Sequence, residues 1–183
     1  MEKIKLFDKC FRPYIPYERL SEAIDRVAAQ INADFKDADD VPVLLCILNG
    51  SVMFTSELMK RLEFPLELVS MKLTSYSGTV STGDVHRVLG PTADLRGRRV
   101  IVVEDIVDTG NTIVALRDYM KEVGARGMKI CTMLLKPDIY KKDVQLDYVG
   151  LEIPPAFIVG FGLDYNGIGR NSKDIYVLDE SAE

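Results

Sequence analysis

The stretch that decides the fold is Val102-Val103-Glu104-Asp105-Ile106-Val107-Asp108-Thr109-Gly110-Asn111-Thr112. Its start belongs to the strand expected at 98–103, whose apolar, β-branched centre is typical of a buried strand. Three carboxylates and a glycine turn flanked by threonines follow. The helical pattern 112–123 comes next and is stopped by Gly124. A strand that leads through such a turn into a helix predicts half of a βαβ unit.

The rest of the chain supplies the other elements of such a fold. Residues 17–35 carry apolar side chains at helical spacing, and residues 43–48 are continuously apolar, as in a strand buried on both faces. Ser51 is a candidate cap for a helix through residue 62. Further strands are expected at 66–76 and 128–135, and shorter ones near 148–153, 157–161 and 175–178. We predict a single α/β domain over residues 1–183, with a parallel twisted sheet flanked by helices.

Ligands of such sheets bind beyond the carboxyl ends of the strands, so the turns after Leu48, Val103 and Leu135 are expected to surround one crevice. Residues 77–91, which are rich in Gly, Ser and Thr, are expected to form a long loop that acts as a lid. The chain's single histidine, His86, is expected in that loop, exposed to solvent.

Composition excludes several classes of function. The net charge of −5 and the scattered 23 Lys and Arg residues argue against a nucleic-acid binder. No run of 18 apolar residues and no signal-peptide pattern is found, so no membrane segment and a cytoplasmic location are expected. The three cysteines, Cys10, Cys46 and Cys131, lack metal-site spacing, and their odd number makes a poor disulfide framework.

The central segment suits a phosphorylated sugar. Backbone N–H groups of the turn and helix start, with threonine hydroxyls, form an anion site, whereas Glu104 and Asp105 can bind sugar hydroxyls or a magnesium ion. The alternative is that these acids are a solvated strand end before a capped helix. A P-loop and a dinucleotide-binding glycine motif are both absent, so a standard nucleoside-triphosphate or dinucleotide site is excluded.

This segment resembles the 5-phosphoribosyl-1-pyrophosphate signature of the type I phosphoribosyltransferases. Further matches resemble the hypoxanthine-guanine branch and span most of the chain from Leu44 onward. They are Leu48-Asn49-Gly50-Ser51, Ser75-Tyr76, Ser81-Thr82-Gly83-Asp84, Leu135-Lys136, Phe157-Ile158-Val159-Gly160 and Leu163-Asp164-Tyr165-Asn166, with Arg170 after them. The resemblance implies a magnesium-dependent enzyme that joins hypoxanthine, and also guanine, to 5-phosphoribosyl-1-pyrophosphate and yields IMP or GMP plus pyrophosphate. It also implies a small hood built from the terminal segments, and a homodimer or homotetramer.

The resemblance also assigns roles to residues. Asp108 is the general base for the purine N7 proton. Magnesium would be held by Glu104, Asp105 and Asp164, and the purine by Lys136, Phe157, Ile158 and Asp164. The residues implied to bind 5-phosphoribosyl-1-pyrophosphate are Leu48, Asn49, Gly50, Ser75, Tyr76, Glu104, Asp105, Asp108, Thr109, Gly110, Asn111, Thr112 and Arg170. The resemblance implies a cis peptide between Leu48 and Asn49, and it places Ser75 and Tyr76 at the hinge or tip of the lid.

Taken without the resemblance, several of these residues have plainer interpretations. Lys136 is then a solvated lysine at a strand end, Phe157 is a core aromatic, and Asp164 and Arg170 are loop charges facing water. Asn49 and Asn111 occupy positions that are often basic in the family. The segment 167–169 departs from the bulkier residues of some members, which leaves the order of hypoxanthine, guanine and xanthine open. The rival class is a regulatory protein that senses a nucleotide and binds RNA or DNA.

Overall fold

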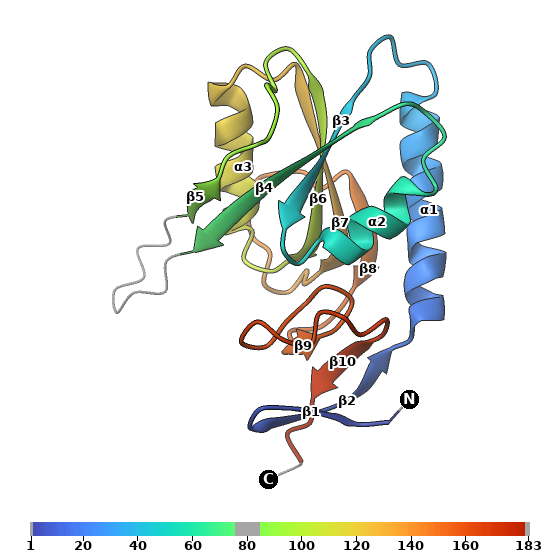
Figure 1. Cartoon of the computed structure of the whole chain (residues 1–183), viewed down its shortest axis with the longest axis vertical. Helices are drawn as coiled ribbons and strands as arrows, with labels where there is room; N and C mark the ends of the chain where they lie inside the picture. The colour runs from blue at the N-terminus through green and yellow to red at the C-terminus, as the bar shows by residue number, and fades with distance from the viewer. Residues whose placement is uncertain (1, 76–84, 182–183) are drawn as a thin grey trace.

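The computed structural model describes residues 2–75 and 85–181 of the chain. Its main body is a six-stranded sheet in the order β5-β4-β3-β6-β7-β8 (Figure 1). The strands are β3 (Val43–Leu48), β4 (Glu67–Ser75), β5 (Val85–Leu89), β6 (Arg99–Val107), β7 (Gly127–Leu135) and β8 (Tyr148–Glu152). Five strands run parallel and only β5 is antiparallel to its neighbour. The predicted parallel α/β sheet is therefore confirmed.

Helices cover both faces of this sheet, because successive strand residues point to opposite sides. Leu44 packs into the cluster that contains residues of α1 (Tyr17–Phe35) and α2 (Val52–Met59). Its neighbour Leu45 packs into the other cluster, which contains Leu116 and Met120 of α3 (Asn111–Glu122). The two-sided burial explains why β3 is almost uniformly apolar.

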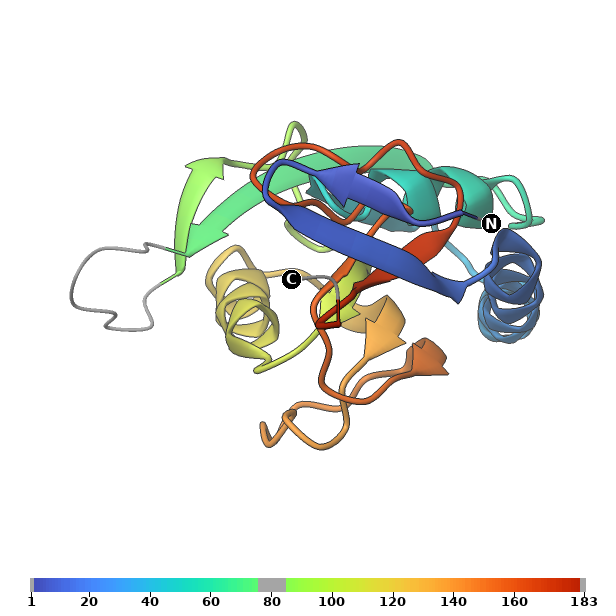
Figure 2. The same ribbon diagram turned by 90° about the horizontal axis from the view of Figure 1, so that it is seen from below.

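A second, smaller sheet forms the predicted hood below the carboxyl ends of the main strands (Figures 1 and 2). It has the order β1-β2-β10-β9, with β1 (Ile4–Leu6), β2 (Lys9–Ile15), β9 (Ile158–Val159) and β10 (Ile175–Leu178). Both ends of the chain thus contribute to it, as the resemblance implies. The N-terminal hairpin of β1 and β2 was not predicted from the sequence.

Three local predictions were wrong. Strand β6 continues to Val107, so Glu104 and Asp105 lie within the strand and not at its end, because pairing with β7 extends to Leu135. The hydroxyl of Ser51 does not cap α2 but donates to the Ile47 carbonyl at 2.7 Å, and α2 ends at Met59. The expected loop 77–91 contains strand β5, in which His86 pairs with Thr74 of β4.

Candidate active site

A polar cavity of about 250 Å³ lies at the carboxyl ends of the central strands. Side chains and backbone from β3, β4, β6, the start of α3 and the hood converge there, although they are far apart in the sequence. This is the edge at which open parallel sheets bind their ligands. The lining residues are Ile47, Leu48, Asn49, Gly50, Leu73, Glu104, Asp105, Thr112, Asp164 and Arg170.

Two adjacent carboxyl groups of β6 border this cavity. Glu104 is buried, and burial together with the neighbouring Asp105 raises its pKa well above the usual range. Burial likewise raises the pKa of Asp105 to about 6, although the Ile106 N–H, which donates to Asp105 Oδ1 at 2.8 Å, and Arg170 both lower it. Both carboxyl groups would therefore ionise more readily beside a divalent cation.

The arrangement fits magnesium better than a metal that needs a full set of protein ligands. Across residues 2–75 and 85–181, no three His, Cys, Asp or Glu side chains are grouped to hold a metal ion. Magnesium usually takes only one or two carboxylates and completes its shell with water and substrate oxygens. Glu104 and Asp105 supply such a pair, and Asp164 lines the same cavity.

The backbone of the β3–α2 turn is pressed against Asp105. A Cβ atom on Gly50 would lie 1.6 Å from Asp105 Oδ2, so only glycine fits at this position. On its other side, Gly50 meets the hood, since a Cβ on Gly162 would lie 1.9 Å from the Gly50 carbonyl oxygen. The peptide between Leu48 and Asn49 is cis, as the resemblance implies.

Arg170 ties the hood segment together at the cavity. Its guanidinium donates to the Gly162 carbonyl at 2.7 Å and forms a 2.6 Å ion pair with Asp164 Oδ1. The other Asp164 oxygen accepts the Gly167 N–H at 2.7 Å. Both charged residues line the cavity, so their interpretation as loop charges that merely face water does not hold.

The turn before α3 presents backbone N–H groups. Gly110 has a φ of +80°, a left-handed conformation that favours glycine, and no side chain caps the helix. The Val114 N–H makes the first bond back into the turn, which leaves the preceding N–H groups available to an anion. Thr112 lines the cavity, whereas Thr109 and Asn111 are exposed.

Lys136 follows β7 and is not a solvated lysine, since its side chain is only 11% exposed. Its Nζ lies 2.9 Å from Asp108 Oδ2, across the gap between β7 and the turn that follows β6. Its own backbone N–H donates to the Val107 carbonyl at 3.0 Å, which fixes where the side chain starts. The structure thus places a cation beside the carboxylate that opens the anion-binding turn.

Phe157 and Ile158 lie in the hood. Phe157 is 45% exposed, so it is not the core aromatic of the plainer interpretation. The Leu178 N–H donates to the Phe157 carbonyl, which makes these two residues a hydrogen-bonded pair of an antiparallel ladder. The next pair, Ile158 and Val177, is therefore not hydrogen-bonded, and the Ile158 N–H and C=O point to the free edge of β9.

Two predicted residues cannot be placed in this way. Ser75 ends β4, but its side chain is not described, and Tyr76 lies outside the described residues together with most of the expected lid. The sequence also left some site residues unpredicted. Gly162 was missed, although its place between Phe161 and Leu163 in a glycine-rich segment was a usable signal. Leu73 and Ile47 are apolar strand residues that carried no signal.

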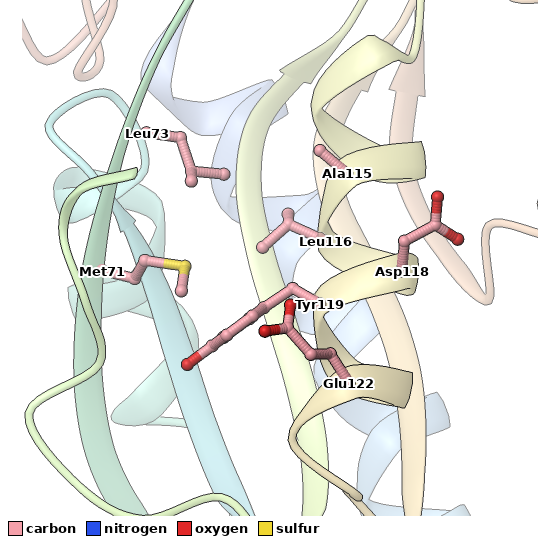
Figure 3. A pocket seen from close by; sticks show the side chains of 7 residues that line it. All are labelled: Met71, Leu73, Ala115, Leu116, Asp118, Tyr119 and Glu122. Carbon is pink, nitrogen blue, oxygen red and sulfur yellow. The ribbon is translucent and has the colours of Figure 1, made fainter. Parts of the chain in front are cut away.

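A second cavity, of about 190 Å³, lies between β4 and α3 and shares Leu73 with the first one (Figure 3). It is lined by Met71, Leu73, Ala115, Leu116, Asp118, Tyr119 and Glu122. Asp118 pairs with Arg117 at 2.9 Å, and the other side chains are mainly apolar. This cavity lacks the adjacent carboxyl pair and the anion-binding turn of the first one.

A parallel sheet that carries a carboxyl pair and a helix start with unpaired N–H groups at its carboxyl edge is typical of α/β enzymes that act on phosphorylated substrates. Residues 16–166 match the model of the phosphoribosyl transferase domain. The chain therefore belongs to the phosphoribosyl transferase family. No helix in the described part of the chain is both long and apolar enough for a membrane span.

Named relatives support this membership over nearly the whole chain. The hypoxanthine-guanine phosphoribosyltransferase of Streptococcus pneumoniae is 40% identical over 167 residues, which are 91% of this chain and 92% of that protein. The hypoxanthine-guanine-xanthine phosphoribosyltransferase of Tritrichomonas foetus is 35% identical and covers 99% and 98%. The crystal structure of a Bacillus anthracis hypoxanthine-guanine phosphoribosyltransferase superposes with a TM-score of 0.85 at 33% identity, covering 92% and 98%.

Proposed function

We propose that this chain is a purine-salvage hypoxanthine-guanine phosphoribosyltransferase. It would transfer the phosphoribosyl group of 5-phosphoribosyl-1-pyrophosphate to N9 of hypoxanthine or guanine, with release of pyrophosphate. The proposal rests on its relatives, which carry this name or that of the xanthine-using enzyme. The observation that carries it is the 2.9 Å contact between Lys136 Nζ and Asp108 Oδ2, at the residue where the anion-binding turn begins.

This pair matches one edge of a 6-oxopurine. The ammonium of Lys136 has donors and no acceptor, so it suits the carbonyl O6. The carboxylate of Asp108 suits N7, from which it can take a proton as general base. The N–H and C=O of Ile158, which point away from β10, would bind the opposite edge of the base, and the half-exposed ring of Phe157 would stack on it.

The phosphoribosyl substrate would occupy the polar cavity. The turn from Asp108 through Thr109, Gly110 and Asn111 to Thr112 would bind its 5′-phosphate, while Glu104 and Asp105 would hold the ribose hydroxyls. The pyrophosphate would lie against the backbone of Leu48, Asn49 and Gly50 and against Arg170, which is suited to bidentate phosphate recognition. Ser75 and Tyr76 are proposed contacts of the same substrate.

Glu104, Asp105 and Asp164 would hold magnesium, which would neutralise charge on the pyrophosphate and on the carboxylates. The protein's own groups would then act mainly by position. The guanidinium of Arg170 would stabilise negative charge on the leaving pyrophosphate, while the Phe157 ring and the Ile158 backbone would hold N9 opposite C1′. Inversion at C1′ is the expected outcome.

The proposal is tested by following pyrophosphate release with hypoxanthine, guanine, xanthine and adenine as alternative bases. Turnover of hypoxanthine and guanine is expected. Failure of both oxopurines, together with tight binding of RNA or DNA at low salt, would favour the regulatory alternative. Xanthine as the best substrate would place the chain closer to its Tritrichomonas foetus relative.

We further propose a homodimer or homotetramer that works in the cytoplasm, with each chain acting as one domain. The three cysteines are free in the structure, and two of them are buried, which suits a reducing compartment. Light scattering after size exclusion measures the assembly directly, and a monomer at micromolar concentration would contradict this part of the proposal.

A further inference from the structure

Four aromatic rings from opposite ends of the chain meet in the hood. Tyr165 packs edge-on against Phe157, with ring centroids 5.7 Å apart and planes at 87°. Phe11 of β2 lies 6.0 Å from Phe157 and 6.2 Å from Tyr165. Phe7 also packs against Tyr165 in an edge geometry, with centroids 6.0 Å apart and planes at 75°. Aromatic pairs in such geometries are more favourable than their buried area alone accounts for.

The polar end of Tyr165 is tied to the N-terminal hairpin. Its hydroxyl donates to Asp8 Oδ1 at 2.8 Å, and the ammonium of Lys9 lies 5.8 Å from the centroid of its ring. The hydrogen bond to Asp8 raises the pKa of Tyr165, so the hydroxyl stays protonated and continues to donate. The phenol ring is therefore held by three ring contacts, by the ammonium of Lys9 and by the hydrogen bond of its hydroxyl.

The turn of the N-terminal hairpin contains a residue in an unfavourable backbone conformation. Leu6 pairs with Lys9, so Phe7 and Asp8 are the two central turn residues. Phe7 has a φ of +52°, in the left-handed region that a bulky side chain rarely adopts, and the residue is 57% exposed. A glycine or asparagine would suit this turn better. Phe7 is not part of the buried core, and its ring is instead in contact with Tyr165.

These observations concern a segment that lies before the matched family domain, which begins at residue 16. We infer that the N-terminal hairpin positions the base platform: Phe7 and Asp8 act through Tyr165 to hold the ring of Phe157 at the angle needed to stack on the purine. The inference rests on the proposed function. A ring that is already held in place loses less freedom when a ligand stacks on it, so the hairpin would raise the affinity for the base and not the affinity for the phosphoribosyl substrate.

The test is steady-state kinetics of the full chain, with KM for hypoxanthine and KM for 5-phosphoribosyl-1-pyrophosphate measured separately. Tyr165→Leu and Phe7→Gly should each raise KM for hypoxanthine about three- to tenfold. KM for the phosphoribosyl substrate and kcat should stay within about twofold of the wild type in both variants. Lys5→Ala is the matched control, since Lys5 is exposed on the same hairpin and lies in β1 away from the rings.

Two further measurements separate positioning from general stability and from direct contact. Phe7→Gly relieves the left-handed strain, so its melting temperature should equal or exceed that of the wild type although its KM for the base rises. Because Phe7 acts through Tyr165, adding Phe7→Gly to Tyr165→Leu should change KM for the base by less than about 1.5-fold.

An inactive wild type would overturn the proposed function, and this inference with it. An active wild type in which Tyr165→Leu and Phe7→Gly leave KM for hypoxanthine unchanged would overturn the inference alone. The same holds if both KM values rise together, or if Phe7→Gly acts only by lowering the melting temperature. Full additivity in the double variant would show that Phe7 does not act through Tyr165.

Discussion

Lys136 Nζ lies 2.9 Å from Asp108 Oδ2, so the two groups proposed to bind the purine are in direct contact with each other. A base entering the site must therefore replace one favourable contact by two, with O6 accepting from Lys136 and N7–H donating to Asp108. Only a base that offers both an acceptor and a donor can do so. The first two predictions follow from this pair.

Adenine should be a very poor substrate. It carries an amino group where hypoxanthine carries O6, so it would set a donor against the largely buried ammonium of Lys136. Sites built around a required polar partner discriminate by about 10⁴-fold, and we expect kcat/KM for adenine at least about a thousandfold below that for hypoxanthine. Lys136→Ala should narrow this gap mainly by loss of hypoxanthine activity. Adenine turnover within about tenfold of hypoxanthine would contradict the role of Lys136.

Asp108→Asn should lower kcat more than it raises KM for the phosphoribosyl substrate, because the amide keeps the shape of the turn but cannot accept the proton. Loss of a general base typically costs about 10²–10⁴-fold. Asp138→Asn, an exposed substitution two residues after Lys136, is the control and should leave kcat unchanged. An Asp108→Asn variant within about threefold of the wild type would mean that water or another group takes the proton.

Gly50→Ala should remove activity through displacement of Asp105. A methyl group at this position would overlap the Asp105 carboxylate, which would have to leave the cavity. Misplacement of a reacting group by about 1 Å can cost about a hundredfold in rate, and we expect at least that loss in kcat/KM. Gly90→Ala is the matched control, since a Cβ there meets nothing within 4 Å. Equal activity of the two variants would show that Asp105 is not held by this contact.

The metal-free protein should lose stability as pH rises through the carboxyl pKa values. A folded-state pKa raised from 3.8 to about 6 means that folded Asp105 retains its proton where the unfolded chain has lost it. The contribution of Asp105 to the unfolding free energy therefore falls between about pH 4 and pH 6, by at most about 3 kcal/mol, and the raised pKa of Glu104 acts in the same direction.

Asp105→Asn tests this prediction, because the amide has no charge to bury and also relieves the neighbouring Glu104. Urea unfolding at pH 4 and pH 7 should show the variant gaining on the wild type as pH rises. The exposed Asp37→Asn should follow the wild type at both pH values. A difference between wild type and Asp105→Asn that does not change with pH would rule out this cause.

Chelation of divalent cations should abolish turnover, and added magnesium should restore it. The cavity proposed to bind a substrate with several phosphate charges is lined by three carboxyl groups, those of Glu104, Asp105 and Asp164. Among the described residues, Arg170 is the only cationic side chain that lines it, so a cation is needed to balance the negative charge. Full activity in excess EDTA would contradict the proposed role of the metal.

The sequence predicted the parts of the fold that follow from local pattern. The uniformly apolar run 43–48 and the helical spacing in 17–35 both gave the observed elements, β3 and α1. The N-terminal hairpin was missed because β1 and β2 alternate polar and apolar residues irregularly, and they are completed by β10 from the far end of the chain. The end of β6 was placed too early because the charged Glu104 and Asp105 interrupt its apolar run, although the strand continues to pair with β7 as far as Val107.

Likewise, some features of the candidate site could be predicted from the sequence and others could not. Glu104 and Asp105 could be proposed from the sequence alone, because two carboxylates follow an apolar strand directly before a glycine turn, whereas Arg170 was proposed only from the family resemblance. The contact of Gly162 with Gly50 could not be predicted, since it depends on how closely two backbones approach across the hood. The pairing of Lys136 with Asp108 required the register of β6 and β7, which no local pattern contains.

The outward-facing N–H and C=O of Ile158 have a consequence for how base preference can change. If one edge of the purine binds there, it binds to main-chain N–H and C=O groups, which every amino acid except proline has. Replacing the Ile158 side chain would not change these main-chain hydrogen bonds to the base. Only a shift of strand β9 relative to β7 would change them. New preferences would then arise at a distance, through residues of the hood that set where this strand lies, and engineering directed at the pocket wall alone would leave the main-chain recognition of oxopurines intact.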